Sequence, residues 1–242
     1  MRLIIGSNLI IVDPDQELLD RVHKELIISN PAYFTQKHIG LRKVEEPKTL
    51  QLFTLGGNVL ELPRGVDISK ELPRFTSIED RMCYGNQVVF PNLKVTPFKF
   101  QEDAADTFVR FGQGGVIAPC GAGKTEIAIV TMAKLQVSTL ILVHSKDLLR
   151  QWQERIRSRL GYEAGQVADG KIDLKPITIA TVQSLYSTRG ILKYTFESFY
   201  KEFGLVILDE AHHAPANSWT VILSRCPAAK RMWLTATEKR RD

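Results

Sequence analysis

The segment Gly115–Thr125, with the sequence GVIAPCGAGKT, constrains this chain more than any other. An apolar run typical of a buried strand leads into a loop with two glycines, and a helix is expected from Lys124. The backbone N–H groups of such a loop and the positive end of the helix dipole face the same point, which favours bound phosphate. The order of strand, loop and helix therefore predicts a site for nucleotide phosphates.

The residues of this loop have distinct expected roles. Gly121 and Gly123 lack a Cβ, so the backbone amides can approach phosphate oxygens. Lys124 is expected to place its charge on the β and γ phosphates, and Thr125 to offer its hydroxyl to Mg²⁺. The pattern GxxxxGK[ST] is incomplete because Ala118 replaces its first glycine, so a glycine-rich turn with a chance Lys-Thr pair is the alternative. The expected phosphate-binding residues are Pro119, Cys120, Gly121, Ala122, Gly123, Lys124 and Thr125.

A second candidate site lies in the segment Gly204–His212, where an apolar run ends in two adjacent carboxylates. The run is typical of a strand buried on both faces. Asp209 is expected to bind the metal ion held by Thr125, directly or through water, and Glu210 to orient and deprotonate an attacking water. Lys124, Asp209 and Glu210 are therefore the candidate catalytic residues, with Thr125 and Asp209 as the candidate metal ligands.

The order of apolar runs predicts two domains. Beyond residue 95, short β-rich runs alternate with longer amphipathic stretches, which predicts a doubly wound α/β parallel sheet over residues 96–242. Before it, a strand pair within Leu3–Val12, a helix from Asp13-Pro14 to about Ile28, and a hairpin of Leu50–Leu55 with Val59–Leu62 predict a small α+β domain over residues 1–95. The strands expected in the sheet are Gly115–Ala118, Thr139–Val143, Ile177–Ala180, Leu205–Leu208 and Arg231–Leu234, and the helices expected between them are Lys124–Leu135, Lys146–Leu160, Val182–Tyr186 and Asn217–Leu223.

Charge and cysteine usage narrow the class of protein. Residues 1–95 hold 12 Lys and Arg against 12 Asp and Glu, whereas residues 96–242 hold 20 against 15, so the net charge of +5 lies in the second part. A basic excess there suits a polyanionic partner, although an ordinary solvated surface explains it equally well. Three scattered cysteines make no disulfide framework and no CxxC zinc pair, which favours a reduced, cytoplasmic setting. A zinc cluster of Asp209, Glu210, His212 and His213 is disfavoured, because adjacent residues do not readily converge on one tetrahedral ion.

Three segments together resemble superfamily 2 helicases and translocases, and within them the XPB-like branch with its phage and bacterial relatives. Cys120–Thr125 is similar to the phosphate loop of that branch, Asp209–His212 reads DEAH, and Leu234–Thr237 is similar to motif III. The resemblance implies a RecA-like lobe that uses ATP and Mg²⁺ and acts on DNA. It also implies that His212, Thr235 and Thr237 couple the hydrolysis site to the nucleic-acid groove.

Two strand-to-helix junctions are the candidate nucleic-acid contacts. Free amides at a helix start bind phosphate oxygens without reading bases. The resemblance extends to these junctions as motif Ia and a TxQ-type motif, and the alternative is that Ser145 and Thr181 are simple N-caps. A solvated helix face explains most of the basic residues that follow Ser145. The residues concerned are His144, Ser145 and Lys146 at the first junction and Thr181 and Gln183 at the second.

Gln101 lies where the family has an aromatic-Gln pair that recognises adenine. A Gln amide can donate to adenine N7 and accept from N6–H, while Phe98 or Phe100 offers a stacking face. The usual Arg-Pro-Tyr-Gln is not reproduced here, and Glu238 stands where a proline often follows motif III. The identity of the base is thus less constrained than phosphate binding.

The resemblance also defines what a complete motor needs. Superfamily 2 motors have two RecA-like lobes, and the second supplies an arginine finger. We expect this chain to contain the first lobe without the second, to be monomeric and not membrane-bound, and to hydrolyse ATP poorly alone. The alternatives are a nucleotide-switched binding module without productive hydrolysis and a small-molecule kinase. RNA remains open as a partner, because no residue identifies a 2′-hydroxyl contact, while the XPB-like resemblance favours DNA.

Overall fold

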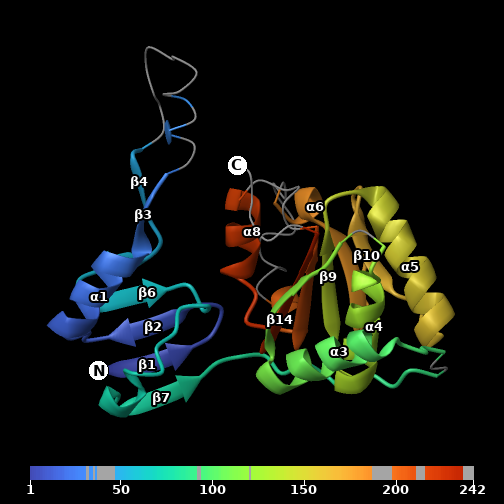
Figure 1. The fold of residues 1–242 in the computed structure, drawn as a ribbon, viewed down its shortest axis with the longest axis horizontal. Helices are drawn as coiled ribbons and strands as arrows, with labels where there is room; N and C mark the ends of the chain where they lie inside the picture. Colours follow the sequence, from blue (N-terminus) through green and yellow to red (C-terminus); the bar gives the residue numbers. More distant parts are fainter. Residues whose placement is uncertain are drawn as a thin grey trace. The chain divides into compact units, whose positions relative to one another are not determined.

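The computed structural model describes residues 1–30, 33–34, 36, 47–91, 94–119, 121–186, 198–210 and 216–236. The chain divides into two compact units, which meet in the sequence between Arg81 and Met82 (Figure 1). Each unit has its own apolar core. No helix in the described ranges is both long enough and apolar enough to cross a membrane.

Among the described residues of the first unit, the helix α1 packs on a five-stranded sheet. The order of strands is β5-β6-β2-β1-β7, and only the pair β1–β7 is parallel. Leu18 and Val22 from α1 pack against Leu3, Ile11 and Leu60 of the strands, and all five side chains are buried. The strands are β1 (Arg2–Ile5), β2 (Leu9–Val12), β5 (Thr54–Gly56), β6 (Val59–Leu62) and β7 (Ser77–Asp80), and the helices are α1 (Gln16–Leu26) and the 3-10 turn η1 (Leu72–Arg74).

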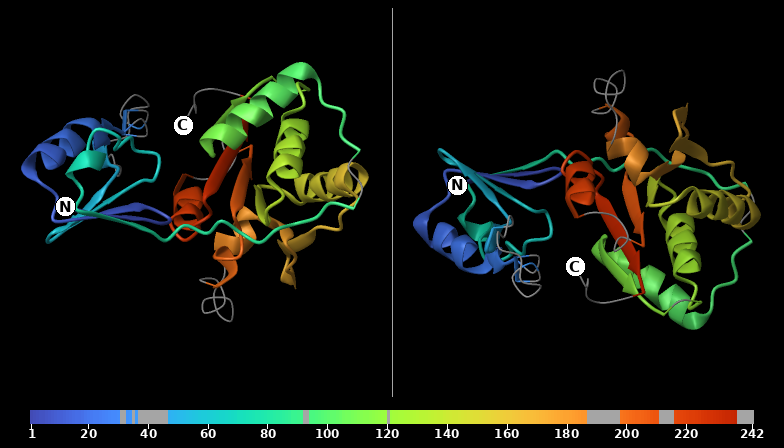
Figure 2. Two further views of the ribbon diagram at one scale, coloured as in Figure 1. Left: turned by 90° about the horizontal axis from the view of Figure 1, so that it is seen from below. Right: turned by 90° about the horizontal axis from the view of Figure 1, so that it is seen from above.

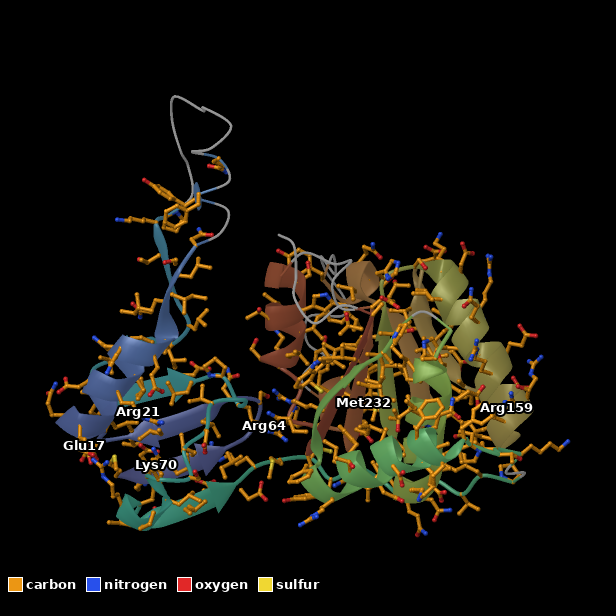
Figure 3. All side chains as sticks on the ribbon, in the orientation of Figure 1. Glu17, Arg21, Arg64, Lys70, Arg159 and Met232 are labelled. Carbon is orange, nitrogen blue, oxygen red and sulfur yellow. The ribbon has the colours of Figure 1, made fainter. Side chains whose placement is uncertain are left out.

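Local polar contacts fix the start and the middle of α1. Asp15 is the N-cap of α1, because its carboxylate accepts a hydrogen bond from the Leu18 amide at 3.0 Å. Arg21, in the middle of α1 (Figure 3), forms an ion pair of 3.2 Å with the buried carboxylate of Glu71 next to η1. These contacts hold the helix against the turn that precedes β7.

The strand prediction near residue 50 was wrong in one respect. The expected strand Leu50–Leu55 is two strands, β4 (Thr49–Gln51) and β5, and β4 pairs with β3 (Ile27–Ser29) instead of joining the hairpin. The helix from Asp13-Pro14 accordingly ends at Leu26, not at Ile28, because the chain turns extended at Ile27 to form that ribbon. The expected strand pair within Leu3–Val12 and the hairpin of β5 with β6 are both present.

The second unit is a seven-stranded sheet of the RecA-like type. The order of strands is β11-β10-β12-β9-β13-β14-β8, and every pair except β10–β11 is parallel. The strands β9, β12 and β13 are buried along their whole length, which explains their unbroken apolar sequence. The strands are β8 (Gln113–Ile117), β9 (Thr139–Val143), β10 (Gly165–Ala168), β11 (Lys171–Asp173), β12 (Ile177–Thr181), β13 (Leu205–Asp209) and β14 (Lys230–Thr235).

Helices cover both faces of this sheet, as a doubly wound fold requires (Figure 2). One apolar core joins the strands to α4 and α5, and a second joins their opposite face to α6 and α8. The helices are α3 (Lys99–Phe111), α4 (Lys124–Leu135), α5 (Lys146–Leu160), α6 (Val182–Tyr186) and α8 (Ala216–Leu223). The expected α/β architecture and helices α4, α5 and α6 are confirmed; α3 and the hairpin of β10 with β11 were not predicted.

The segment before α3 packs with the second unit. Cys83 forms a parallel bridge with Ala228, Gln87 an antiparallel bridge with Val137, and Val88 is buried in the α4 and α5 core. The rhythm of apolar runs changes at residue 95, which predicts a boundary there. The contacts place residues 82–91 and 94–95 with the second unit instead, because isolated bridges leave no periodic signal in the sequence.

Candidate active site

The register of the second sheet brings the predicted segments to one edge. Thr181 pairs with Val143, Asp209 with Leu234, and Thr235 with Ile117, so five strands end at the same level. Because all five strands are parallel, their carboxyl ends lie together, and the turns that follow them can line one site. The phosphate loop, the acid pair and both strand-to-helix junctions follow these strand ends.

The phosphate loop has the backbone that its glycines permit. Gly121 and Gly123 both have left-handed φ angles, of 85° and 79°, and the helix α4 begins directly after Gly123. The ammonium group of Lys124 donates to the carbonyl oxygens of Ala118 at 3.0 Å and Pro119 at 3.4 Å. The lysine is thus folded back over its own loop, where it neutralises carbonyl dipoles that point inward. Cys120 lies outside the described residues.

Lys124 lies close to the acid pair at the end of β13. The Nζ atom of Lys124 lies 3.9 Å from a carboxylate oxygen of Glu210, across 86 positions of the sequence. Both side chains are mostly shielded from solvent, with exposed fractions of 9% and 21%. Glu210 has a φ of 51°, a left-handed conformation that a non-glycine residue adopts at a cost of about 1–2 kcal/mol. Strain of this kind concentrates at functional sites.

Asp209 is held by a partner that the sequence did not identify. Its Oδ2 accepts a hydrogen bond of 2.8 Å from the indole N–H of Trp152 in α5. Burial raises the pKa of Asp209 above its ordinary value, and the charge of Glu210 raises it further, while the Trp152 N–H and the Lys124 ammonium oppose the shift. The site therefore carries a buried carboxylate whose negative charge lacks full compensation.

These donors suit a magnesium ion. Carboxylate and hydroxyl oxygens are hard ligands of the kind Mg²⁺ prefers, and a nearby cation would relieve the burial of the Asp209 charge. Asp209 and Thr125 are the residues that would hold it, with nucleotide phosphates completing the coordination. Within the part of the chain that the structure describes, no group of three or more His, Cys, Asp and Glu side chains has an arrangement suited to a metal ion. His212 and His213 lie outside that part.

Gln101 lies against the phosphate loop. Its Oε1 accepts from the Phe98 amide at 3.0 Å, and its Nε2 donates to the Ala122 carbonyl at 3.3 Å. The side chain is buried, and both ends of its amide are hydrogen-bonded, Oε1 to the start of α3 and Nε2 to the loop. Phe98 and Phe100 stack on each other with their ring centroids 6.0 Å apart, and both are largely exposed. An exposed aromatic pair and the buried amide thus lie at the same helix start.

The first junction shows its capping role directly. The Ser145 hydroxyl accepts from the Leu148 amide at 3.3 Å, so it is the N-cap of α5. Lys146 forms an ion pair of 2.5 Å with Asp169, and His144 before it is half-buried. The basic residues of α5 are paired with carboxylates, as expected for a solvated face: Arg150 with Asp147, Arg155 and Arg159 with Glu126, and Arg157 with Glu163.

The second junction and motif III are also at the sheet edge. The Thr181 hydroxyl donates to the Ser184 hydroxyl at 2.8 Å and is buried, while Gln183 is exposed. Thr235 is buried, and its carbonyl accepts from the Ala118 amide at 3.2 Å, which joins motif III to the phosphate-loop strand. His212 and Thr237, the other two residues expected to couple the sites, lie outside the described residues.

Two features of the site were missed from the sequence. Trp152 falls on the apolar stripe of α5, so its period-3.6 position predicts only a core residue. Glu126, in the first turn of α4, accepts from Arg155 at 3.5 Å and from Arg159 at 3.3 Å, which ties α4 to α5. Figure 3 shows Arg159 near the C-terminal end of α5. Neither contact has a local sequence signal, because the partners lie 29 to 57 positions apart.

Comparison with known proteins identifies the family. The model of the family described as the res subunit of type III restriction enzymes matches residues 94–240, which is more than half of the chain. The chain belongs to this family. The match spans α3, the phosphate loop, the acid pair and β14, so it covers the site described above.

Individual relatives agree with this assignment. The DNA 3'-5' translocase XPB2 of Sulfurisphaera tokodaii is 35% identical over 143 residues, which are 59% of this chain and 31% of that protein. The DNA 3'-5' helicase XPB of Kineococcus radiotolerans is 35% identical over 147 residues, which are 59% of this chain and 26% of that protein. The resemblance to the XPB-like branch of superfamily 2 is thereby confirmed. The chain spans less than a third of the length of these relatives.

A solved structure agrees with the fold of both units. The UvsW helicase from bacteriophage T4 matches with a TM-score of 0.66 at 15% identity, and the match covers 98% of this chain and 93% of that one. At that identity the likeness concerns the fold alone. Because the match covers nearly the whole chain, the likeness in fold includes the first unit as well as the second.

Proposed function

We propose that the second unit is the ATP-binding first motor lobe of an ATP-dependent DNA helicase or translocase. The observation that carries the proposal is the approach of Lys124 to Glu210, with Asp209 beside it, at the carboxyl ends of parallel strands. A lysine on a glycine loop and an acid pair are the parts that phosphoryl transfer from a nucleotide requires. Relatives named as DNA helicases and translocases support the same reading.

The side chains of this site have separate roles in the proposed reaction. Lys124 exchanges its two loop carbonyls for phosphate oxygens, and the amides from Gly121 to Thr125 surround the same oxygens. Glu210, held in an unusual backbone conformation, accepts a proton from the attacking water. A bound Mg²⁺ would supply positive charge that offsets the negative charge on the phosphates. Thr125 and Asp209 are the residues that would hold that ion.

The base and the nucleic acid have separate places in this proposal. The exposed pair of Phe98 and Phe100 offers a stacking surface for adenine, and Gln101 is the polar group beside it. The start of α5, with Ser145 and Lys146, and the Thr181 junction take strand phosphates. The names of the relatives favour DNA as the strand.

We further propose that movement along DNA needs a second RecA-like lobe. The described residues contain one sheet of the RecA-like type. An arginine finger from a second lobe stabilises charge on the transferred phosphoryl group and is worth about 10³–10⁵ in rate in nucleotide hydrolases. The 242-residue chain alone should therefore bind nucleotide and turn it over slowly. The role of the first unit in this motor is an accessory one, in engaging the duplex or positioning the lobe.

Equilibrium binding of a fluorescent ATP analogue to the whole chain tests the proposal. Lys124→Ala should weaken binding at least tenfold, whereas Glu210→Gln should keep the affinity and abolish residual turnover. Lys134→Ala is a matched control, because this lysine lies on α4 in ion pairs with Asp106 and Glu102, away from the loop. Unchanged affinity in Lys124→Ala would refute the phosphate site.

Turnover distinguishes the proposal from its alternatives. If Glu210→Gln left turnover at the wild-type level, the chain would be a nucleotide-switched binding module. Robust DNA-stimulated hydrolysis by the 242-residue chain, lost in Lys124→Ala, would show that a second lobe is not required.

A further inference from the structure

One buried contact that the proposed mechanism does not use joins α5 to the acid pair. The indole N–H of Trp152 donates to Oδ2 of Asp209 at 2.8 Å, across 57 positions of the sequence. The side chains are deeply buried, with exposed fractions of 1% for Trp152 and 5% for Asp209. A hydrogen bond to a charged group in such surroundings is stronger than one in water and is directional.

Packing alone does not require an indole at this position. Trp152 shares the apolar face of α5 with Leu149, Ile156 and Leu160, which have no polar atoms and are equally buried. A phenylalanine could fill most of the same volume. What only Trp152 supplies on this face is an N–H group, and that group points at the carboxylate predicted to bind the metal. The N–H holds one oxygen of Asp209 and so fixes the plane of the carboxylate.

The helix that carries Trp152 is itself fixed relative to the phosphate loop. Glu126, one residue after Thr125, accepts hydrogen bonds from Arg155 and Arg159, which follow Trp152 by one and two turns of α5. The position of the indole is thereby fixed relative to the start of α4, where Thr125, the proposed hydroxyl ligand of the metal, lies. The same helix thus joins both sides of the metal site.

We propose that Trp152 is a positioning residue that orients Asp209 for Mg²⁺ and so sets the affinity of the nucleotide site for the ion. The inference rests on the proposed function, because it needs Asp209 to be a metal ligand. Groups that hydrogen-bond to metal ligands are known to change metal affinity by about 10–100-fold when they are removed. Trp152 acts through Asp209 and does not touch the nucleotide.

The test compares Trp152→Phe with Ile156→Val in the whole chain. Ile156 lies one turn further on the same buried face and has no polar atom, so its variant reproduces a core defect without removing the N–H. Binding of a fluorescent ATP analogue is measured in EDTA and across a Mg²⁺ titration. We expect Trp152→Phe to raise the Mg²⁺ midpoint about tenfold or more and to leave affinity in EDTA unchanged. Ile156→Val should leave both unchanged.

The arms separate failure of this inference from failure of the proposed function. A wild-type Mg²⁺ midpoint in Trp152→Phe, together with lost binding in Lys124→Ala, overturns the role of Trp152 alone. Undiminished binding in Lys124→Ala overturns the nucleotide site itself. A loss of affinity in Trp152→Phe that is equal with and without Mg²⁺ shows a purely structural role, which also overturns the inference.

A measurement on the wild-type chain covers the case in which Trp152→Phe does not fold. The indole N–H resonance of Trp152 is followed by ¹⁵N NMR, after assignment against Trp219→Phe and Trp233→Phe. We expect it to shift when Mg²⁺ is added to the nucleotide complex, and to shift again in Asp209→Asn. An indole resonance that ignores both changes overturns the proposal.

Discussion

Replacing Gly123 by alanine should damage the phosphate loop through one identifiable side chain. Gly123 has a φ of 79°, and a Cβ built there would overlap Nε2 of Gln101. The left-handed backbone costs an alanine about 1–2 kcal/mol. Moving Nε2 aside breaks its hydrogen bond to the Ala122 carbonyl, at about 1 kcal/mol. The free energy of unfolding should therefore fall by about 2–3 kcal/mol in Gly123→Ala.

Gly121 provides a matched control within the same loop. Its φ of 85° is similarly left-handed, but a Cβ there would meet no atom within 4 Å. Gly121→Ala should therefore lose only the backbone share, about 1–2 kcal/mol. Urea unfolding followed by circular dichroism measures both variants, and nucleotide affinity measured in parallel should fall more in Gly123→Ala.

A double-mutant cycle tests the cause. In a Gln101→Ala background, the cost of Gly123→Ala should drop to that of Gly121→Ala, because the obstructing amide is gone. Equal destabilisation by Gly121→Ala and Gly123→Ala in the wild-type background, or no change in the Gln101→Ala background, would refute the reasoning.

Three further predictions follow from the charges and the backbone. Asp209→Asn removes a buried carboxylate whose pKa is raised, and such a carboxylate lowers the stability of the fold as pH rises through that pKa. In thermal scans at pH 7 the variant should therefore unfold at a higher temperature than wild type, and the difference should shrink toward pH 4. Glu210→Gly should raise the free energy of unfolding by about 1 kcal/mol through relief of its left-handed φ, while Glu210→Gln should not, as urea titration would show. Partial burial raises the pKa of Asp15, but the Leu18 amide and Arg74 outweigh it and leave the pKa below its ordinary 3.8. The stabilisation by the Asp15 cap is therefore present at neutral pH and lost as pH falls through that lowered pKa. In thermal scans that follow the first unit, Asp15→Ala should lower the free energy of unfolding by about 1 kcal/mol at pH 7 and by little in strong acid. A difference between the variant and wild type that does not change with pH would contradict this.

The parts of the fold with periodic apolar sequence could be predicted. The strand β9 and the helix α5 have the predicted bounds, because burial on both faces of a strand, or on one face of a helix, leaves a pattern in the sequence. The ribbon of β3 and β4 left none, because its residues are mostly exposed and too few to show alternation. The boundary between the units was displaced for a related reason, since isolated bridges such as Cys83 to Ala228 have no periodicity.

The meeting of Lys124 with the acid pair could be predicted because parallel strands carry their turns to one edge, whatever their separation in the sequence. The packing of Gln101 could not. Its expected role came from the resemblance to a family in which an aromatic-Gln pair recognises adenine, whereas the structure places its amide on Phe98 and Ala122. A side-chain amide satisfies whichever backbone groups lie within reach, and only tertiary structure shows which those are. Adenine recognition by Gln101 therefore stays a prediction.

Trp152 shows most clearly why a site is larger than its motifs. A motif records residues that must be spaced along the chain, such as the loop before α4 or the pair after β13. Trp152 acts from a third element, and its polar atom is a single N–H on a side chain that the apolar period of α5 already explains. If the indole orients Asp209, then α5 has three linked roles. Its first residues form the proposed contact with the nucleic-acid strand, and its buried face holds the proposed metal ligand. Its last turns are hydrogen-bonded to α4 through Glu126. A shift of α5 on binding nucleic acid would then reach the hydrolysis site through one hydrogen bond.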